Sequence, residues 1–313
     1  MNLSANTVEG SKFGQKNFTR FHGGLYFLEL KMTESQIKSQ VKESVEAVRA
    51  QKPLAPSITN TVTINFVANA QLAVGGSAAM VYLPDEGEFV SEVGSAVYIN
   101  AGTMFPVYEE SLPRTAKRLF ELKKNWVLDP VGIGIGSLRT KLLAGFKNFP
   151  PSIVRGNASE VIALAKLWGI EVSASSQGPK GVDTVDSVND AENAAKALAK
   201  YINEKRGGLG GAVAVSGIED LVTDGENVVY SKGGSHFMEK ITGSGCSLGG
   251  VCAVYAGVAS PFIAALTATQ IYNLAGKRAE AKVNAPASFQ VAFLDELYLA
   301  SAEDVANNPF ELK

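Results

Sequence analysis

The sequence contains few of the residues that metal centres, disulfide frameworks and hydrolytic triads need. Its 313 residues include 2 histidines, His22 and His236, and 2 cysteines. A histidine-rich zinc site or a Ser-His-Asp triad therefore lacks convincing material, and any metal would have to be a hard ion held by oxygen ligands. Cys246 and Cys252 lie on one predicted helix but project to different faces, so they cannot bridge each other and a disulfide framework is excluded.

An excess of one charge and a long apolar run are also missing. The 29 Lys and Arg residues face 31 Asp and Glu residues, for a formal net charge of −2. This leaves no broad basic surface of the kind that nucleic acid binding requires. No apolar stretch reaches about 20 uninterrupted residues, because Pro261 and several glycines break the best candidate. We therefore expect neither a nucleic acid partner nor a membrane span.

What is present is a globular, enzyme-sized chain behind a short extension. With 46% hydrophobic residues, the chain can bury one large core or two modest ones. Residues 1–31 are rich in polar residues, glycine and aromatics, and we interpret them as an N-terminal extension for which disorder is the simplest explanation. Residues 32–313 are expected to form a single domain, because a helix-like pattern with a plausible cap opens at Met32.

Helical and strand patterns alternate through this domain. The spacing of Ile37, Val41, Val45 and Val48 predicts an amphipathic helix over 33–50. Further predicted elements are strands at 96–99, 126–128, 152–154 and 212–215, with helices near 111–124, 158–168 and 188–204. Such alternation is typical of parallel βαβ units with helices on both faces of one sheet, which is the α/β class.

Polar residues and glycines follow each predicted strand. The segments are Asn100-Ala101-Gly102, Asp129-Pro130-Val131-Gly132, Arg155-Gly156-Asn157 and Ser216-Gly217. Because the carboxyl ends of parallel strands form the ligand crevice of such sheets, we expect these segments to line one rim. Each also has an ordinary explanation: Asn157 and Glu160 have the spacing of a helix capping box, and Asp129 before Pro130 suits the start of a turn.

The segment Gly243-Ser244-Gly245-Cys246 precedes a long apolar run and predicts a glycine turn at the start of a helix. Unpaired N–H groups and the helix dipole favour an anion such as phosphate there. The same position should lower the pKa of Cys246 and make its thiol more reactive. The alternative for Cys246 is a buried, inert side chain, which is the role that we assign to Cys252.

Several longer motifs occur in the order seen in hydroxyethylthiazole kinases, and the sequence resembles that family from residue 33 to about residue 300. The motifs are residues 57–69 (SITNTVTINFVAN), Gly75-Gly76-Ser77-Ala78-Ala79-Met80, Leu128-Asp129-Pro130-Val131-Gly132, Arg139-Thr140, residues 155–160 (RGNASE), Lys180-Gly181-Val182-Asp183, Gly243-Ser244-Gly245-Cys246 and Ser288-Phe289-Gln290.

The resemblance implies a ribokinase-like three-layer α/β/α sandwich with a mostly parallel central sheet. It implies transfer of the γ-phosphoryl group of ATP to the hydroxyl of 4-methyl-5-(2-hydroxyethyl)thiazole, in thiamine biosynthesis and salvage. It also implies a requirement for Mg²⁺, a cytoplasmic location and a homotrimer with active sites at the subunit interfaces.

By position, the resemblance assigns roles to individual residues of this sequence. The implied substrate contacts are Asn60, Met80 and Gly243. The implied ATP contacts are Arg155 and Ser216, with Asp129 in the phosphate region. Asn157 and Glu160, together with Asp129, match the group associated with Mg²⁺ and phosphate. The implied catalytic residues lie in the glycine turn. Gly243 and Gly245 would donate backbone N–H groups to the phosphoryl group, and Cys246 stands where related sugar kinases place a catalytic aspartate.

Of two departures from the family pattern, Pro56 bears on the identity of the substrate more than on the reaction type, and Ser216 is a mild change. Pro56 stands where many family members have histidine, and Ser216 replaces the more usual threonine but keeps a hydroxyl. Three functions stay open: a hydroxyethylthiazole kinase, a ribokinase-like kinase of another small alcohol such as a pyrimidine or pyridine carbinol, and a catalytically silent binding protein.

Overall fold

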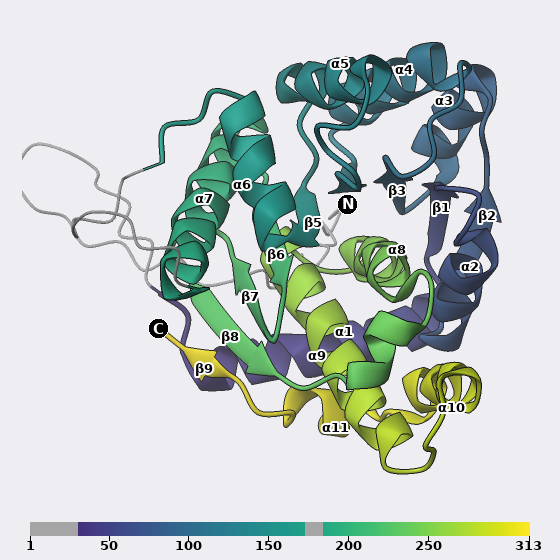
Figure 1. Cartoon of the computed structure of the whole chain (residues 1–313), viewed down its shortest axis with the longest axis vertical. Coiled ribbons are helices and arrows are strands. Elements are labelled where there is room, and N and C mark those ends of the chain that lie inside the picture. Colours follow the sequence, from purple (N-terminus) through teal and green to yellow (C-terminus); the bar gives the residue numbers. More distant parts are fainter. Residues whose placement is uncertain (1–30, 173–183) are drawn as a thin grey trace, which may run out of the picture. The chain divides into compact units, whose positions relative to one another are not determined.

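One mixed sheet organises the part of the chain that the structure, a computed structural model, describes: residues 31–172 and 184–313. The predicted extension at 1–31, apart from Lys31, and the motif at 180–183 lie outside these residues. The strands are ordered β2-β1-β3-β4-β5-β6-β7-β8-β9, and the first six positions of this order pair in parallel (Figure 1).

Among the strands that the structure describes, five crossover connections link the six parallel ones, and three antiparallel strands complete the sheet. The parallel strands are β1 (Leu54–Ile58), β2 (Ser77–Met80), β3 (Ala96–Asn100), β4 (Asn125–Asp129), β5 (Ile153–Asn157) and β6 (Ala212–Ser216). The strands β7 (Glu219–Thr223), β8 (Val228–Lys232) and β9 (Glu311–Leu312) continue the sheet in antiparallel fashion. The sheet is therefore mostly parallel, as predicted.

Helices cover both faces of the sheet. The first face packs against α1 (Glu34–Gln51), α2 (Ile64–Ala73), α8 (Ser244–Ala256), α9 (Pro261–Glu280), α10 (Pro286–Leu299) and α11 (Ala302–Ala306). The second packs against α3 (Pro84–Val93), α4 (Tyr108–Glu121), α5 (Ser137–Gly145), η1 (Phe146–Asn148), α6 (Ala158–Leu167) and α7 (Thr184–Lys205). A short helix, η2 (His236–Lys240), precedes α8.

The alternation of side chains along each strand explains the two cores. In β3, Ala96 and Tyr98 join the core under α8 and α9, whereas Val97 and Ile99 join the core under α4 and α6. Both sets of side chains are buried, so the strand reads as a continuous apolar run. The predicted α/β/α sandwich is confirmed.

The predicted elements correspond to observed ones. The strands at 96–99, 126–128, 152–154 and 212–215 are β3 to β6, and the four predicted helices are α1, α4, α6 and α7. The strands β1 and β2 were not predicted from the pattern of the sequence. Pro56 lies inside β1 and lacks a backbone N–H, and β2 consists of small residues and one methionine, so neither carries the usual β signature.

The strand ends meet at one rim, as predicted. Asn100 at the end of β3 pairs with Asp129 at the end of β4, and Asn157 at the end of β5 pairs with Ser216 at the end of β6. Because β3 to β6 are adjacent and parallel, their polar terminal residues face the same crevice. Within the described ranges, the structure contains no helix that is both long and apolar enough to cross a membrane.

Candidate active site

The glycine turn stands at the start of α8, where the sequence predicts it. Gly243 has a φ of +91°, in the left-handed region, and a Cβ added there would lie 2.7 Å from Thr63 Cγ2. Only glycine fits this close approach without strain. The first bond inside the helix runs from the N–H of Ser247 to the carbonyl of Gly243 at 2.8 Å. The N–H groups of residues 244–246 precede that bond and are available to an anion.

Asp129 is the centre of a buried polar network below this turn. Its Oδ2 atom accepts hydrogen bonds from the hydroxyl of Tyr98 at 3.1 Å, from Asn100 Nδ2 at 3.2 Å and from Arg155 Nη1 at 3.4 Å. Its Oδ1 atom is buried and has no hydrogen-bond partner among the described residues. One oxygen of the carboxylate is thus fixed by three donors, and the other is left for a ligand.

A second set of bonds connects this network to Cys246. Asn100 Oδ1 accepts a hydrogen bond from Asn60 Nδ2 at 2.9 Å, and the same Asn60 amide lies 3.4 Å from the Sγ atom of Cys246. Asn60 and Asn100 are both buried. The structure therefore brings the loop after β1, the end of β3 and the first turn of α8 into one contiguous group.

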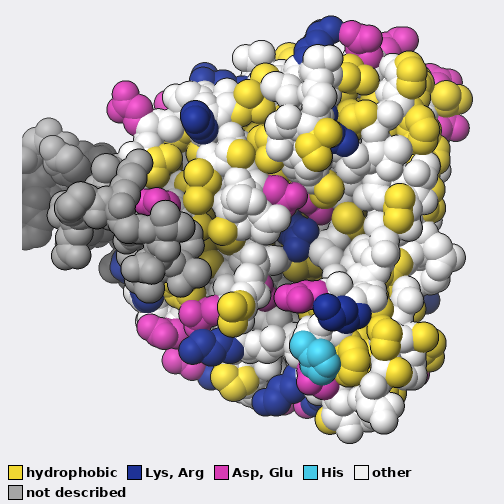
Figure 2. Space-filling view, in the orientation of Figure 1, with side chains coloured by type: hydrophobic (Ala, Val, Ile, Leu, Met, Phe, Trp, Pro, Cys, Tyr) yellow, Lys and Arg dark blue, Asp and Glu magenta, His cyan; other side chains and the backbone are white. Residues whose placement is uncertain are grey.

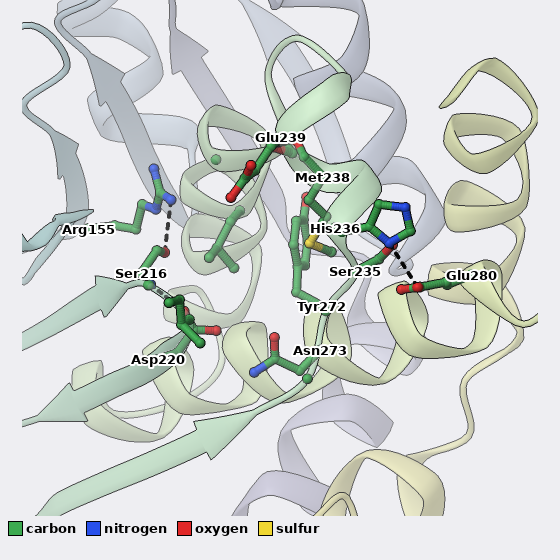
Figure 3. Close-up of a pocket in the computed structure, with 17 residues that line it drawn as sticks. Arg155, Ser216, Asp220, Ser235, His236, Met238, Glu239, Tyr272, Asn273 and Glu280 are labelled. Carbon is green, nitrogen blue, oxygen red and sulfur yellow. Dashed lines mark hydrogen bonds and ion pairs between the residues drawn. The ribbon is translucent and has the colours of Figure 1, made fainter. Parts of the chain in front are cut away.

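Arg155 extends the group toward β6. Its Nη2 atom donates to Ser216 Oγ at 2.9 Å, as Figure 3 shows. A Cβ added to Gly245 would lie 2.7 Å from Arg155 Nη1, so the guanidinium lies directly against the first turn of α8. Although burial opposes its charge, the carboxylate of Asp129 raises the pKa of Arg155, which keeps it a cation. A positive charge thus stands beside the free N–H groups of the turn.

Burial controls the two ionisable groups that could handle a proton. It raises the pKa of Asp129 to about 6, although the adjacent Arg155 acts in the opposite direction. Burial also raises the pKa of Cys246, and the charge of Asp129 adds to that effect. The predicted lowering of the Cys246 pKa is therefore wrong, because loss of water around the thiol outweighs the helix N-terminus.

A pocket of about 520 Å³ opens beside Arg155. Its walls come from the first turn of α8, the β6–β7 turn, the segment around η2, and α9, and they include Ser216, Asp220, His236, Glu239 and Asn273 (Figure 3). Figure 2 shows this face hollowed near its centre, with a basic side chain in the hollow and acidic side chains around it. The pocket is large enough for a small-molecule ligand, and Ser244 and Gly245 of the glycine turn form part of its wall.

Asn157 and Glu160 form the predicted capping box at the start of α6. Asn157 Oδ1 accepts from the N–H of Glu160 at 2.9 Å, and Glu160 Oε2 accepts from the N–H of Asn157 at 2.9 Å. The ordinary explanation of their spacing is thus confirmed. Glu160 also raises the pKa of Asp129 through its charge, so the two carboxylates act on one region of the crevice.

Comparisons with known proteins agree with the arrangement of these residues. A sequence profile described as the hydroxyethylthiazole kinase family matches residues 45–303. A hydroxyethylthiazole kinase of Bifidobacterium longum (strain DJO10A) is 51% identical over 286 residues, which cover 88% of this chain and 91% of the relative. A hydroxyethylthiazole kinase of Brachyspira hyodysenteriae is 38% identical over 87% of this chain and 98% of the relative.

Solved structures extend this agreement to the fold. The structure of a hydroxyethylthiazole kinase protein from Pyrococcus horikoshii OT3 superposes with a TM-score of 0.76 at 28% identity, over 88% of this chain and 98% of that chain. A ribokinase-like superfamily protein of Enterococcus faecalis V583 superposes with a TM-score of 0.54 at 13% identity, over 88% and 98% of the two chains, which bears on the fold alone.

This chain belongs to the hydroxyethylthiazole kinase family. The family resemblance and the ribokinase-like fold inferred from the sequence are confirmed. Pro56, at which the sequence departs from many hydroxyethylthiazole kinases, is buried within β1, two residues before the strand ends. It therefore stiffens the approach to the Asn60 loop and does not itself line the rim.

The structure separates Met80 from the other residues that the hydroxyethylthiazole kinase pattern singles out. Met80 ends β2, the edge strand, and β1 lies between it and β3. Its side chain is half-buried, and it pairs in register with Ser57. Asn60, Asp129, Arg155, Ser216 and Cys246, in contrast, form one connected group.

Sequence reasoning missed several residues of the candidate site. Tyr98 lies within a buried strand, where an aromatic residue normally signals packing, although its hydroxyl was a sign that a polar partner must be near. Asn100 was placed on the rim without a role, although it follows its strand as Asp129 does. Asp220, His236 and Asn273 reach the pocket from β7, η2 and α9, which no local pattern connects.

Proposed function

We propose that this protein transfers the γ-phosphoryl group of ATP to the hydroxyl of 4-methyl-5-(2-hydroxyethyl)thiazole. The observation that carries the proposal is the position of Arg155, which lies between the 520 Å³ pocket and the buried group of Asp129, Asn60 and Cys246. ATP would occupy the pocket, and the alcohol would approach from the side of Asn60 and Cys246. The phosphoryl group would then cross the first turn of α8.

The first turn of α8 is suited to a phosphoryl group in transfer. Phosphoryl transfer proceeds through a loose transition state, so catalysis depends mainly on positioning and on stabilising charge. The N–H groups of residues 244–246 are fixed in place by the buried helix behind them and need no rearrangement to donate. Arg155 adds a cation that is already held by Asp129 and Ser216.

Mg²⁺ is the metal that this donor set fits. Asp129 Oδ1 is a buried carboxylate oxygen without a partner among the described residues, and Glu160 supplies a second carboxylate, with the side-chain oxygen of Asn157 next to it. Hard divalent ions prefer such oxygen ligands. Within the described ranges, no three His, Cys, Asp or Glu residues are grouped closely enough to hold a metal alone. Phosphate oxygens and water would have to complete the coordination, and the ion would neutralise charge on the phosphates.

Cys246 is better placed to orient the substrate hydroxyl than to deprotonate it completely. Because burial raises its pKa, the thiol is largely protonated at neutral pH. A loose transition state does not require a strong base, since the proton leaves the alcohol late. We therefore assign Cys246 a helper role in orienting the substrate hydroxyl, whose proton passes to a phosphate oxygen or to water, and the larger share of catalysis to Gly243, Gly245 and Arg155.

The assembly that we propose is a homotrimer of the domain at 32–313, with a neighbouring chain next to Met80. Support comes from the uncovered edge strand β2 and from large apolar side chains exposed on either side of it. These are Leu72 (53% exposed), Leu83 (49%), Phe89 (63%) and Val93 (50%). Apolar clusters of this kind mark surfaces that partners cover.

The test is a set of reactions with Mg²⁺-ATP and three alcohols: hydroxyethylthiazole, hydroxymethylpyrimidine and pyridoxine. We expect ADP release and a phosphorylated product, identified by mass, with the thiazole in clear preference. Phosphorylation of a different alcohol in place of the thiazole would identify a kinase of another specificity. Saturable binding without ADP release from any alcohol would identify a binding protein.

A further inference from the structure

We propose that Tyr98 is a positioning residue for phosphoryl transfer, which orients the Asp129 carboxylate, and that Gly249 is required to accommodate its ring. This inference rests on the proposed function. It concerns a side chain that does not line the pocket, and it assigns a role to a tyrosine in the middle of a buried strand.

The hydroxyl of Tyr98 occupies the junction of the polar network. It accepts from Asn100 Nδ2 at 2.8 Å and donates to Asp129 Oδ2 at 3.1 Å. Tyr98 and Asn100 are two apart on β3 and therefore project from the same face of the sheet, and Asn100 pairs in register with Asp129 on β4. The phenol thus lies under the rim, one layer below the ligand crevice.

The consequence for Asp129 is an asymmetric carboxylate. Tyr98, Asn100 and Arg155 all bind Oδ2, and Oδ1 remains without a partner among the described residues. Of the three donors, Arg155 also faces the pocket and Ser216, so a ligand competes for it. Tyr98 is fully buried and cannot turn to a ligand, so it holds Oδ2 whatever the crevice contains.

Gly249 shows that α8 is built around this phenol. A Cβ added to Gly249 would lie 2.4 Å from Tyr98 Cε2 and 2.8 Å from its hydroxyl oxygen. Such distances do not occur between real side chains, so any larger residue would displace the ring. Glycine inside a helix is disfavoured relative to alanine, and its presence in the third position after Cys246 is explained by the space that Tyr98 needs.

A need to satisfy a buried phenol does not account for these bonds. Tyr255 on α8 is equally buried, and its hydroxyl has no partner among the described residues. This core therefore tolerates an unpaired phenol on the same side of the sheet. The bonds of Tyr98 are specific to its place beside Asp129.

The central experiment compares Tyr98→Phe with Tyr255→Phe, because each substitution removes one buried hydroxyl and keeps the ring. We expect Tyr98→Phe to lower kcat about 10-fold or more, as loss of a hydrogen-bond partner of a metal-ligating carboxylate typically does. The KM for the alcohol and the midpoint of thermal unfolding should stay close to those of the wild type. Tyr255→Phe should leave kcat, KM and the midpoint unchanged. A wild-type kcat in Tyr98→Phe would overturn the proposal.

A double variant separates positioning from packing. Gly249→Ala alone should lower both the thermal midpoint and kcat, since the added methyl displaces the ring of Tyr98. In Tyr98→Val, the space left by the ring should accept the methyl, so Tyr98→Val/Gly249→Ala should regain stability relative to Gly249→Ala. Its kcat should stay low. Recovery of kcat together with stability would show that packing alone was at stake.

The rates are measured with the alcohol that the wild type phosphorylates. If the wild type phosphorylates the thiazole and Tyr98→Phe is fully active, the positioning role fails and the proposed function stands. If the wild type uses a different alcohol, the substrate assignment fails while the comparison of variants still decides the role of Tyr98. A wild type that phosphorylates no alcohol removes both proposals.

Discussion

At Cys246, two effects act on one thiol in opposite directions. The first turn of α8 favours the thiolate, whereas burial and the negative charge of Asp129 favour the neutral form. Burial dominates because the half-buried thiol lies against Asn60 and the packed helix, where a thiolate would lose part of its hydration. The adjacent Arg155 also favours the thiolate, but burial and the charge of Asp129 outweigh it, so a position at a helix N-terminus does not by itself make a cysteine acidic.

This balance predicts how Cys246 reacts with an alkylating reagent. The rate of modification by iodoacetamide should be low at neutral pH and should keep rising beyond about pH 8.5, the usual pKa of a free thiol. The sign follows from the raised pKa, because the reactive thiolate gains population only as the pH passes that higher value. Mass spectrometry of the modified protein measures the rate.

Cys246→Ser is the control, since the remaining Cys252 is fully buried and should not react in the folded protein. A modification rate that levels off near pH 7 would contradict the raised pKa and return the thiol to the role of an acidic nucleophile.

Residues near the end of a strand could be placed from the sequence, and residues that act across the sheet could not. Asp129 and Arg155 could be placed at the rim from the sequence, because a charged residue at the end of an apolar run is expected there. Tyr98 acts through Asp129 on the neighbouring strand, and Gly249 acts through Tyr98 from a helix. Their roles depend on the pairing of strands and helices that are distant in sequence, which no local pattern contains.

At the scale of one element, the start of α6 combines structural and chemical demands in the same pair of residues. Asn157 and Glu160 satisfy free N–H groups at the start of the helix, and they are also the residues that we propose as Mg²⁺ ligands. The capping box of α1 can be compared with that of α6, because it pairs Thr33 with Gln36 instead of a glutamate. A neutral amide therefore serves as well as a carboxylate in this structural role.

Glu160→Gln therefore separates the two demands. We expect the thermal midpoint to change little, because glutamine can make the same bond to the N–H of Asn157. Activity should fall, and more Mg²⁺ should be needed for half of the maximal rate, because one negative charge is lost near Asp129. Titration of the reaction with Mg²⁺ measures the effect.

The matched control is Asp304→Asn in the capping box of α11, where Ser301 is the N-cap residue and which is far from the rim in sequence. It should leave the Mg²⁺ dependence unchanged. A Glu160→Gln protein that unfolds more easily but turns over normally per folded molecule would show that the pair is only a cap.

The elements with a strong period were predicted, and those without one were not. The helix α1 has its four apolar positions fully buried, and β3 to β6 are short runs between turn signals. In contrast, β1 contains Pro56, β7 and β8 mix charged and polar residues with their apolar ones, and β9 has only two residues. They form strands because neighbouring strands of the sheet pair with their backbone groups, which is a tertiary effect.

At the scale of the whole molecule, the two edge strands of the sheet, β2 and β9, differ in length and in their surroundings. The last strand on one side is β9, only two residues long, which is a usual way of blunting an edge. On the other side, β2 ends at Met80 and is flanked by the exposed apolar side chains of α2 and α3. This asymmetry favours a partner at β2.

A charged residue in place of the exposed Phe89 of α3 should dissociate the proposed trimer. Phe89→Glu should lower the molar mass measured by light scattering from three chains to one and should reduce activity, since Met80 would lose its neighbour. Leu209→Glu, at an exposed apolar residue between α7 and β6, should leave both unchanged. A wild type that scatters light as a single chain at working concentration would contradict the assembly.

The burial of α8 has a consequence for how the enzyme fails. Every residue from Ser247 to Ala256 is buried, and the helix packs against β1, β3, β4, α2 and α9 at once. The body of the helix, which carries the first turn, therefore cannot leave its place while the rest of the fold persists. Within the intact assembly, heating should not produce a folded but inactive chain, and the lifetime of catalysis should equal the lifetime of the native assembly itself.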